Sequence, residues 1–121
     1  MDKQILREIG LSEGEIKVYL ALLKLGEAKK TELAKHAGVS SSKVYEICSR
    51  LQKKGIVGTI LKDKKTHFQA MEPKRLLDFF NEKTAKIENQ RKELEKAIPM
   101  LENYIKIKEN KAVLYEGLNA I

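Results

Sequence analysis

Residues 31–54 constrain the fold of this chain more than any other stretch, because two short helical patterns meet there at a tight turn. In the first pattern, Leu33, Ala34 and Ala37 have the apolar spacing of a short helix, and Gly38 follows where a left-handed residue costs least. In the second pattern, apolar residues recur at steps of three and four along one stripe. This stripe consists of Val44, Ile47, Cys48 and Leu51. The two patterns together predict a helix-turn-helix.

The rest of the second helix carries small hydroxyls, cations and one aromatic ring. Ser40 is a good N-cap, so we expect the serine run to open the helix and to present free amides and hydroxyls to an anion or a base edge. A helix built in this way suits the major groove of DNA. Helix-turn-helices also occur as plain packing units, so the motif alone leaves both interpretations open.

Two β-prone runs follow Gly55, namely IVGTIL and THFQA, and the lysine-rich turn KDKK joins them. Helix, turn, helix and basic hairpin is the order of parts in a winged helix. We therefore predict a winged helix-turn-helix DNA-binding domain over residues 1–72, mainly α-helical with a small β-hairpin wing. Ahead of the motif, Ser12 and Glu15 form a capping-box pair in front of a core helix that reaches about Leu25.

A heptad repeat begins after Pro73 and continues for more than four heptads. We predict a long helix over residues 73–109 that dimerises as a coiled coil. The alternative is that it folds back on its own domain, but that domain is too small to supply a partner of equal length. Lys83 and Glu88 should pair across a parallel dimer, and Pro99 predicts a kink or a break. The seam consists of Leu77, Phe80, Thr84, Ile87, Arg91, Leu94, Ile98, Leu101 and Ile105.

The formal net charge of +7 is concentrated in the first part of the chain, with a balance of +6 over residues 1–70 and +1 over residues 71–121. The single cysteine, Cys48, lies on the apolar stripe, so neither a disulfide framework nor a cysteine-based metal site is available. No signal peptide and no apolar run of membrane-spanning length is present. We therefore expect a cytoplasmic protein with no membrane partner.

Catalytic and metal-binding patterns are missing from the sequence. His36 and His67 fall on different predicted elements, with no third ligand at metal spacing. There is no phosphate-cradling glycine loop, no nucleophile elbow and no paired-carboxylate constellation outside the solvated helix faces. We therefore expect no enzyme, no metal site and no cofactor.

These observations favour a transcriptional regulator that binds promoter or operator DNA sequence-specifically as a homodimer. The alternative is a protein-interaction adaptor that uses the winged helix and the helical arm as docking surfaces. On the first interpretation the serines, Lys43 and Tyr45 reach base edges, while the other cations contact phosphates. The candidate DNA-binding residues are Lys29, Lys30, Thr31, Ser40, Ser41, Ser42, Lys43, Tyr45, Ser49, Arg50, Lys53, Lys62, Lys64 and Lys65.

The stretches LSEGEIKVYLALLKLGEA and SKVYEICSRLQKKG, the hairpin, the proline-led helix and a final VLYEG together resemble the TrmB family of archaeal transcriptional regulators. The resemblance covers most of residues 9–117. It implies a winged-helix DNA-binding domain, a dimerising coiled coil and, usually, a C-terminal effector domain that binds sugars. Residues 110–121 resemble only the first strand of that domain, so we do not expect this chain to bind a small-molecule effector. Family members often carry proline and arginine where this chain has Ser40 and Ser41, so the family's base preference does not carry over.

Overall fold

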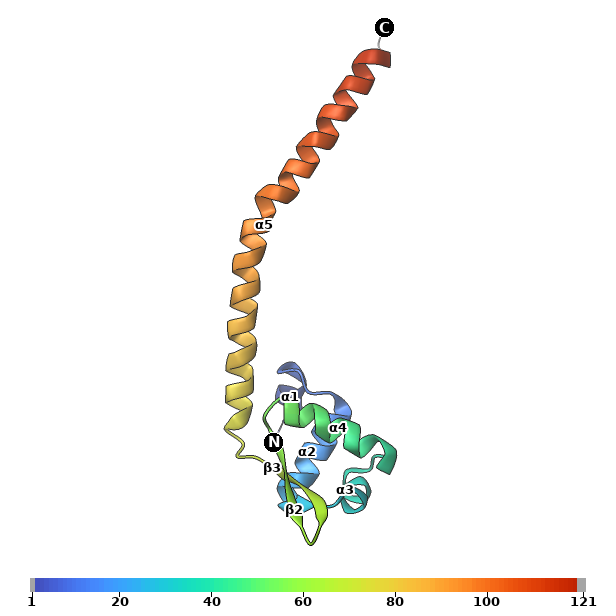
Figure 1. Cartoon of the computed structure of the whole chain (residues 1–121), viewed down its shortest axis with the longest axis vertical. Coiled ribbons are helices and arrows are strands. Elements are labelled where there is room, and N and C mark those ends of the chain that lie inside the picture. The colour runs from blue at the N-terminus through green and yellow to red at the C-terminus, as the bar shows by residue number, and fades with distance from the viewer. Residues whose placement is uncertain (1, 120–121) are drawn as a thin grey trace. The chain divides into compact units, whose positions relative to one another are not determined.

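The computed structural model describes the backbone of residues 2–119 and the side chains of residues 2–111. Contacts divide the chain into two units, residues 1–82 and residues 83–121. The predicted fold, a winged helix-turn-helix followed by a long helix, is confirmed (Figure 1). Its elements in chain order are α1 (Gln4–Glu8), α2 (Glu13–Leu25), β1 (Glu27–Ala28), α3 (Lys30–Ala37), α4 (Ser41–Lys53), β2 (Val57–Lys62), β3 (Lys65–Ala70) and α5 (Arg75–Asn119).

Helix α2 is the central core helix of the first unit and begins with the predicted capping box. The Glu15 amide donates to the Ser12 hydroxyl at 3.2 Å, and the Ser12 amide donates to the Glu15 carboxylate at 2.9 Å. These two bonds satisfy amides that the first turn of a helix would otherwise leave without partners. The apolar side chains of α2 then fill the centre of the core. Those buried are Ile16, Val18, Tyr19, Ala21 and Leu22.

The helix-turn-helix consists of α3 and α4. Gly38 ends α3 in a left-handed conformation with φ 71° and ψ 33°, as the sequence predicted. The predicted stripe of α4 is buried throughout, with Val44, Cys48 and Leu51 fully inaccessible to solvent and Ile47 only 5% exposed. This stripe packs against α2 and α3, and thereby fixes which side of α4 faces outward.

The sheet has three antiparallel strands in the order β1-β3-β2, one more than the sequence predicted. The additional strand, β1, contains only Glu27 and Ala28, which pair with Gln69 and Phe68 of β3. Two residues are too few to show a strand periodicity, so the sequence offered no signal for β1. Ala28 and Phe68 are both buried, and the strand joins the hairpin to the start of α3.

The first turns of α5 belong to the winged-helix unit, because Leu76 and Phe79 pack against its core. By contacts, this unit therefore extends to Glu82, beyond the predicted boundary at residue 72. Pro73 and Glu72 precede the helix, which begins at Arg75.

Helix α5 is continuous through Pro99, so a break there was a wrong prediction. Figure 1 shows that the helix bends in its orange part, which agrees with the predicted kink. A proline removes one backbone hydrogen bond and crowds the preceding turn, and a bend relieves this crowding without ending the helix.

The C-terminal tail also differs from the prediction. Helix α5 does not end near residue 109 but extends to Asn119, so the strand predicted there is wrong as far as the backbone is described. A strand needs a neighbouring strand for its hydrogen bonds, whereas a helix satisfies them within the segment. Residues 120 and 121 of the predicted tail lie outside the described residues. Among the helices that the structure describes, none has the length and apolar character needed to cross a membrane.

Candidate nucleic-acid interface

The outward side of α4 is the surface opposite its buried stripe. Ser42, Glu46, Ser49 and Lys53 follow one another at helical spacing along the middle of this surface. Ser42, Glu46 and Lys53 are exposed and Ser49 is half-buried. Three of the predicted residues, Ser42, Ser49 and Lys53, thus lie on the outward side of α4, and the middle of that side also carries the Glu46 carboxylate, which is not among the predicted contacts.

At the N-terminus of α4, Ser40 is the N-cap residue that the sequence predicted, yet its side chain makes no capping hydrogen bond. Its hydroxyl lies 3.2 Å from the Ser42 hydroxyl instead. The amides at the start of α4 therefore have no side-chain cap, and together with the positive end of the helix dipole they suit a phosphate or a base acceptor.

Tyr45 is tied to the sheet by its ring. Its centroid lies 6.3 Å from that of Phe68 on β3, and the rings cross at 74°, an edge-to-face geometry. The residue is nevertheless 65% exposed. The contact holds α4 against β3 of the wing and leaves part of the Tyr45 side chain at the surface.

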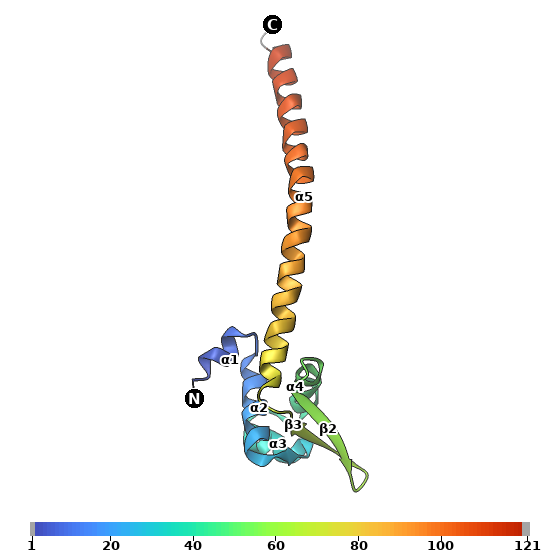
Figure 2. The same cartoon turned by 90° about the vertical axis from the view of Figure 1, so that its left-hand side faces the viewer.

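The hairpin of β2 and β3 projects beyond the helices of the first unit, as Figure 2 shows. Its two-residue turn has positive φ at both Asp63 (50°) and Lys64 (63°), the pattern of a type I′ turn. Glycine or asparagine is usual at the second position, so a lysine there is held in a conformation that costs about 1 kcal/mol. Lys64 and Lys65 are exposed at this tip.

The third predicted wing cation, Lys62, forms an ion pair with Glu27 of β1. Glu27 lies two residues before Lys29, the N-cap residue of α3. The pair therefore brings the wing close to the start of α3. Lys29, Lys30 and Thr31 are exposed at the start of α3. No side chain caps this helix.

A buried ion pair that the sequence did not reveal joins the end of α4 to the start of α2. The Lys54 ammonium donates to the Glu15 carboxylate at 2.5 Å, and the Glu15 side chain is only 3% exposed. Burial alone would raise the pKa of Glu15, but hydrogen bonds from Lys54 and Ser12 outweigh it, so the pKa is lowered. The Lys54 ammonium also lies 5.8 Å from the centre of the Phe79 ring, in the second turn of α5.

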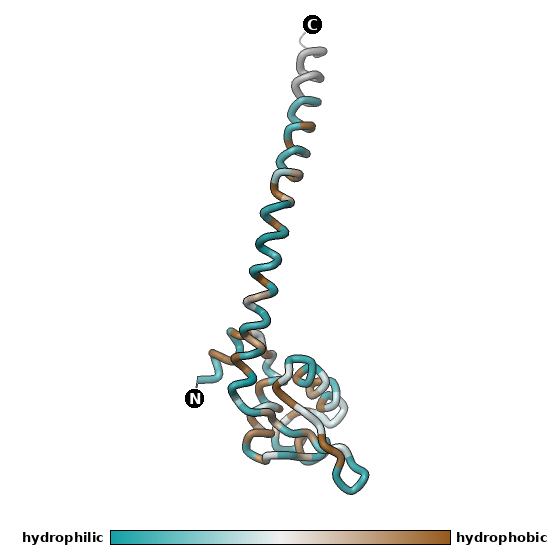
Figure 3. Tube along the Cα trace, turned by 60° about the vertical axis from the view of Figure 1, so that its left-hand side comes forward, coloured by the Kyte–Doolittle hydropathy of each residue, from teal (hydrophilic) through white to brown (hydrophobic). Residues whose placement is uncertain are grey.

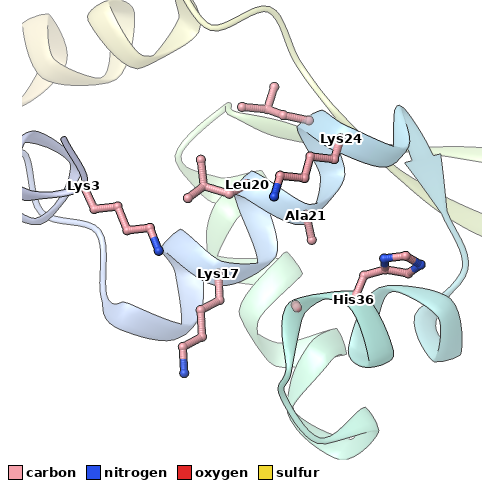
Figure 4. A pocket seen from close by; sticks show the side chains of 8 residues that line it. Lys3, Lys17, Leu20, Ala21, Lys24 and His36 are labelled. Carbon is pink, nitrogen blue, oxygen red and sulfur yellow. The ribbon is translucent and has the colours of Figure 1, made fainter. Parts of the chain in front are cut away.

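A shallow basic hollow of about 540 Å³ lies elsewhere on the first unit (Figure 4). None of the residues that line it belongs to α4 or to the hairpin. Its apolar lining consists of Leu20, Ala21, Leu23 and Ala37, and its cationic or polar lining consists of Lys3, Lys17, Lys24 and His36. Among residues 2–111, no group of three or more histidine, cysteine or acidic side chains could hold a metal ion.

The predicted seam of α5 lies on the surface of the single chain. Ile87 is 56% exposed, Leu94 58% and Leu101 53%, so these large apolar side chains of the seam face solvent in the single chain. Figure 3 shows such apolar positions recurring along an otherwise hydrophilic helix. The other exposed apolar seam residues are Leu77, Phe80, Ile98 and Ile105.

The fold defines a protein of the winged helix-turn-helix class, and the helix-turn-helix is a common DNA-binding motif. Residues 6–74 match the family model described as the sugar-specific transcriptional regulator TrmB. The chain belongs to this family, so the resemblance seen in the sequence is confirmed.

The chain is 39% identical over 57 residues to the HTH-type sugar sensing transcriptional regulator TrmBL1 of Pyrococcus furiosus. This match covers 47% of the chain but only 17% of that relative. Among solved structures, the chain is similar to the archaeal chromatin protein TrmBL2, whose structure is described as showing a novel mode of DNA binding. The TM-score is 0.72 at 25% identity, over 81% of this chain and 38% of that chain. YusO of Bacillus subtilis shares the fold, with a TM-score of 0.53 at 17% identity over 85% of this chain and 80% of that one.

Proposed function

We propose that this chain binds double-stranded DNA as a homodimer and regulates transcription at specific operator sequences. The observation that carries the proposal is the pairing of an uncapped, serine-lined recognition helix with a lysine-tipped wing, in a domain of a family of transcriptional regulators. Such a protein acts on chromosomal DNA, which fits a cytoplasmic location.

In the proposed complex, α4 enters the major groove. Its first turn approaches base edges through Ser41, Ser42 and Lys43, because these side chains stand at the open N-terminus of the helix. Lys29 and Lys30 at the start of α3, with Lys64 and Lys65 at the wing tip, contact phosphates on either side. Lys62 contributes less than the tip lysines, since its charge is already compensated by Glu27.

The exposed seam of α5 supports the proposed homodimer. A single winged helix reads too few base pairs for tight specific binding, so two copies must be joined. In a parallel coiled coil, Ile87, Leu94 and Leu101 of each copy would bury the apolar surface that the single chain exposes. The polar seam residues Thr84 and Arg91 would favour one register over others.

Sugar sensing is not part of the proposal. The family description and the TrmBL1 name refer to sugars, but the chain spans 17% of TrmBL1. The part of the family that this chain matches, residues 6–74, is the winged helix and the residues that lead into α5.

Selection of bound duplexes from a random-sequence DNA pool tests the proposal. The 121-residue chain should enrich a two-part, inverted-repeat sequence, and its affinity should fall steeply with salt because lysines release counterions from phosphates. Replacing Ser42 or Lys43 with alanine should weaken discrimination by about 1–3 kcal/mol for each base that the variant no longer contacts. Absence of DNA binding at low salt would reject the proposal.

The basic hollow favours the alternative function, a protein-interaction adaptor. Its lining combines apolar side chains with three lysines, which suit an acidic partner surface rather than a base edge, and the hollow shares no lining residue with α4 or the wing. Replacing Lys17 and Lys24 with glutamate separates the two functions. These changes should leave DNA affinity nearly unaltered if α4 and the wing bind DNA, and should abolish partner binding if the hollow is a docking surface.

A further inference from the structure

Glu46 occupies an unexpected place for an acidic residue on a DNA-binding helix. It lies on the middle of the outward side of α4, one turn after Ser42 and about one turn before Ser49. Its side chain is 71% exposed. The two neighbours along this line are short, so the Glu46 carboxylate extends further from the helix axis than either serine.

The phosphates of DNA make this position unfavourable for a carboxylate that makes no contact with the bases. An acidic group in the groove is repelled by two phosphate strands unless a donor on a base edge compensates it. Glu46 also accepts a hydrogen bond from Arg50, with 3.0 Å between the Arg50 Nη1 and the Glu46 Oε1 atoms. An exposed pair of this kind stabilises a helix by only about 0.3–0.5 kcal/mol, wherever on the surface it lies.

We propose that Glu46 and Arg50 together read a C·G base pair in the major groove. The inference rests on the proposed function, since it requires α4 to lie in that groove. It adds Glu46 to the DNA-contacting residues, and it moves Arg50 from the phosphate contacts predicted from the sequence to a base contact.

The chemistry of the pair matches that of a C·G pair. An ionised carboxylate only accepts hydrogen bonds and a guanidinium only donates them. In the major groove, cytosine presents the N4 amino donor, and guanine presents the O6 and N7 acceptors beside it. The hydrogen bond between Glu46 and Arg50 leaves the second carboxylate oxygen and further N–H groups of the guanidinium for those edges. The ion pair thus holds an acceptor next to a fork of donors before DNA arrives, which lowers the entropy cost of binding.

Selection from a random DNA pool tests the inference with three forms of the 121-residue chain. Glu46→Gln removes the charge and offers an amide, which pairs best with adenine. Glu13→Gln is the matched control, because Glu13 also pairs with an arginine, Arg7, but lies at the start of α2. The wild type and the control should enrich the same C·G pair, and Glu46→Gln should lose that preference by about 5- to 150-fold or shift it to A·T.

Arg50→Lys provides a second, independent variant in case Glu46→Gln alters folding. Lysine keeps the charge but not the planar fork, so the guanine preference should fall while the salt dependence of binding stays the same. Unchanged base preferences in both variants would overturn the inference and leave the proposed function standing. A wild type that enriches no sequence would overturn base reading by this pair. A wild type that binds no DNA at low salt would overturn the proposed function itself.

Discussion

Replacing Lys54 with methionine should destabilise the winged-helix unit more than any change of an exposed lysine. The variant keeps most of the apolar stem but removes the ammonium, so the Glu15 carboxylate, 3% exposed, retains the Ser12 amide at 2.9 Å and loses its charged partner. Breaking a buried ion pair by removing one partner costs about 3–5 kcal/mol. The Lys54 side chain is 22% exposed, so water can partly replace it, and we expect a loss of about 2–3 kcal/mol.

This loss should depend on pH in a defined direction. In the wild type the pKa of Glu15 is lowered, so its contribution to stability is complete above the ordinary value of 4.5 and is lost as the pH falls through the lowered pKa. In Lys54→Met, burial is no longer outweighed by Lys54 and the pKa of Glu15 rises. The free energy of unfolding of the variant should therefore lie furthest below that of the wild type at pH 7. The difference should shrink as the pH falls and the Glu15 carboxyl of the variant becomes protonated.

Urea unfolding followed by circular dichroism, at fixed protomer concentration, measures both effects. Lys62→Met is the matched control, because Lys62 forms an exposed ion pair with Glu27 and should cost less than about 1 kcal/mol. The double variant Glu15→Gln/Lys54→Met should recover much of the lost stability, since no uncompensated charge then remains buried. A Lys54→Met protein within about 0.5 kcal/mol of the wild type, or a deficit that persists unchanged to pH 4, would refute the reasoning.

Three further predictions concern the wing and the core. Replacing Lys64 and Lys65 with alanine should weaken binding to all DNA sequences alike. The slope of log affinity against log salt should fall by about 0.9 for each phosphate that the wing no longer neutralises. An unchanged slope would show that the wing does not contact the DNA phosphates. Lys64→Gly should instead raise the free energy of unfolding by about 0.5–1 kcal/mol, because glycine relieves the left-handed strain at φ 63°, while still weakening DNA binding. Burial raises the pKa of Cys48 to about 12, so its thiol should react with a disulfide reagent at pH 8 only as fast as the domain opens. Rapid labelling of the native protein would contradict the burial of the α4 stripe.

The sequence predicted those parts of the fold in which one segment carries its own signal. The stripe of α4, the glycine at the end of α3 and the capping box of α2 are each encoded by spacing within a few residues, and each was found as predicted. Features that join distant segments could not be predicted in this way. Strand β1 exists only because Glu27 and Ala28 meet β3, and nothing in two residues indicates that partner.

In the candidate site, too, local features could be predicted from the sequence and contacts between distant segments could not. Serines and lysines on α4 and the wing were selected from local pattern, and the structure places them on outward surfaces. The pair of Lys54 with Glu15 spans 39 residues, so only the folded chain reveals it. The pair of Glu46 with Arg50 is local, and its spacing of four residues was a usable signal. The predicted DNA-binding residues are cations, hydroxyls and one tyrosine, so the acidic Glu46 is not among them.

The proposed function depends most on the seam of α5 joining two DNA-binding units. Replacing both Ile87 and Leu94 with aspartate places two charges in the middle of that seam. Burial of each charge without a partner costs several kcal/mol, more than a short coiled coil can lose. The winged-helix unit, whose core contains neither residue, should stay folded.

Sedimentation velocity of the 121-residue chain with a labelled duplex from the selection measures assembly and binding together. We predict that the wild type sediments as a dimer and binds the duplex as a dimer at micromolar concentration. The double aspartate variant should sediment as a folded monomer that binds the duplex only weakly and at low salt. A wild type that is monomeric both free and on DNA, or a variant that still dimerises, would contradict the proposed function.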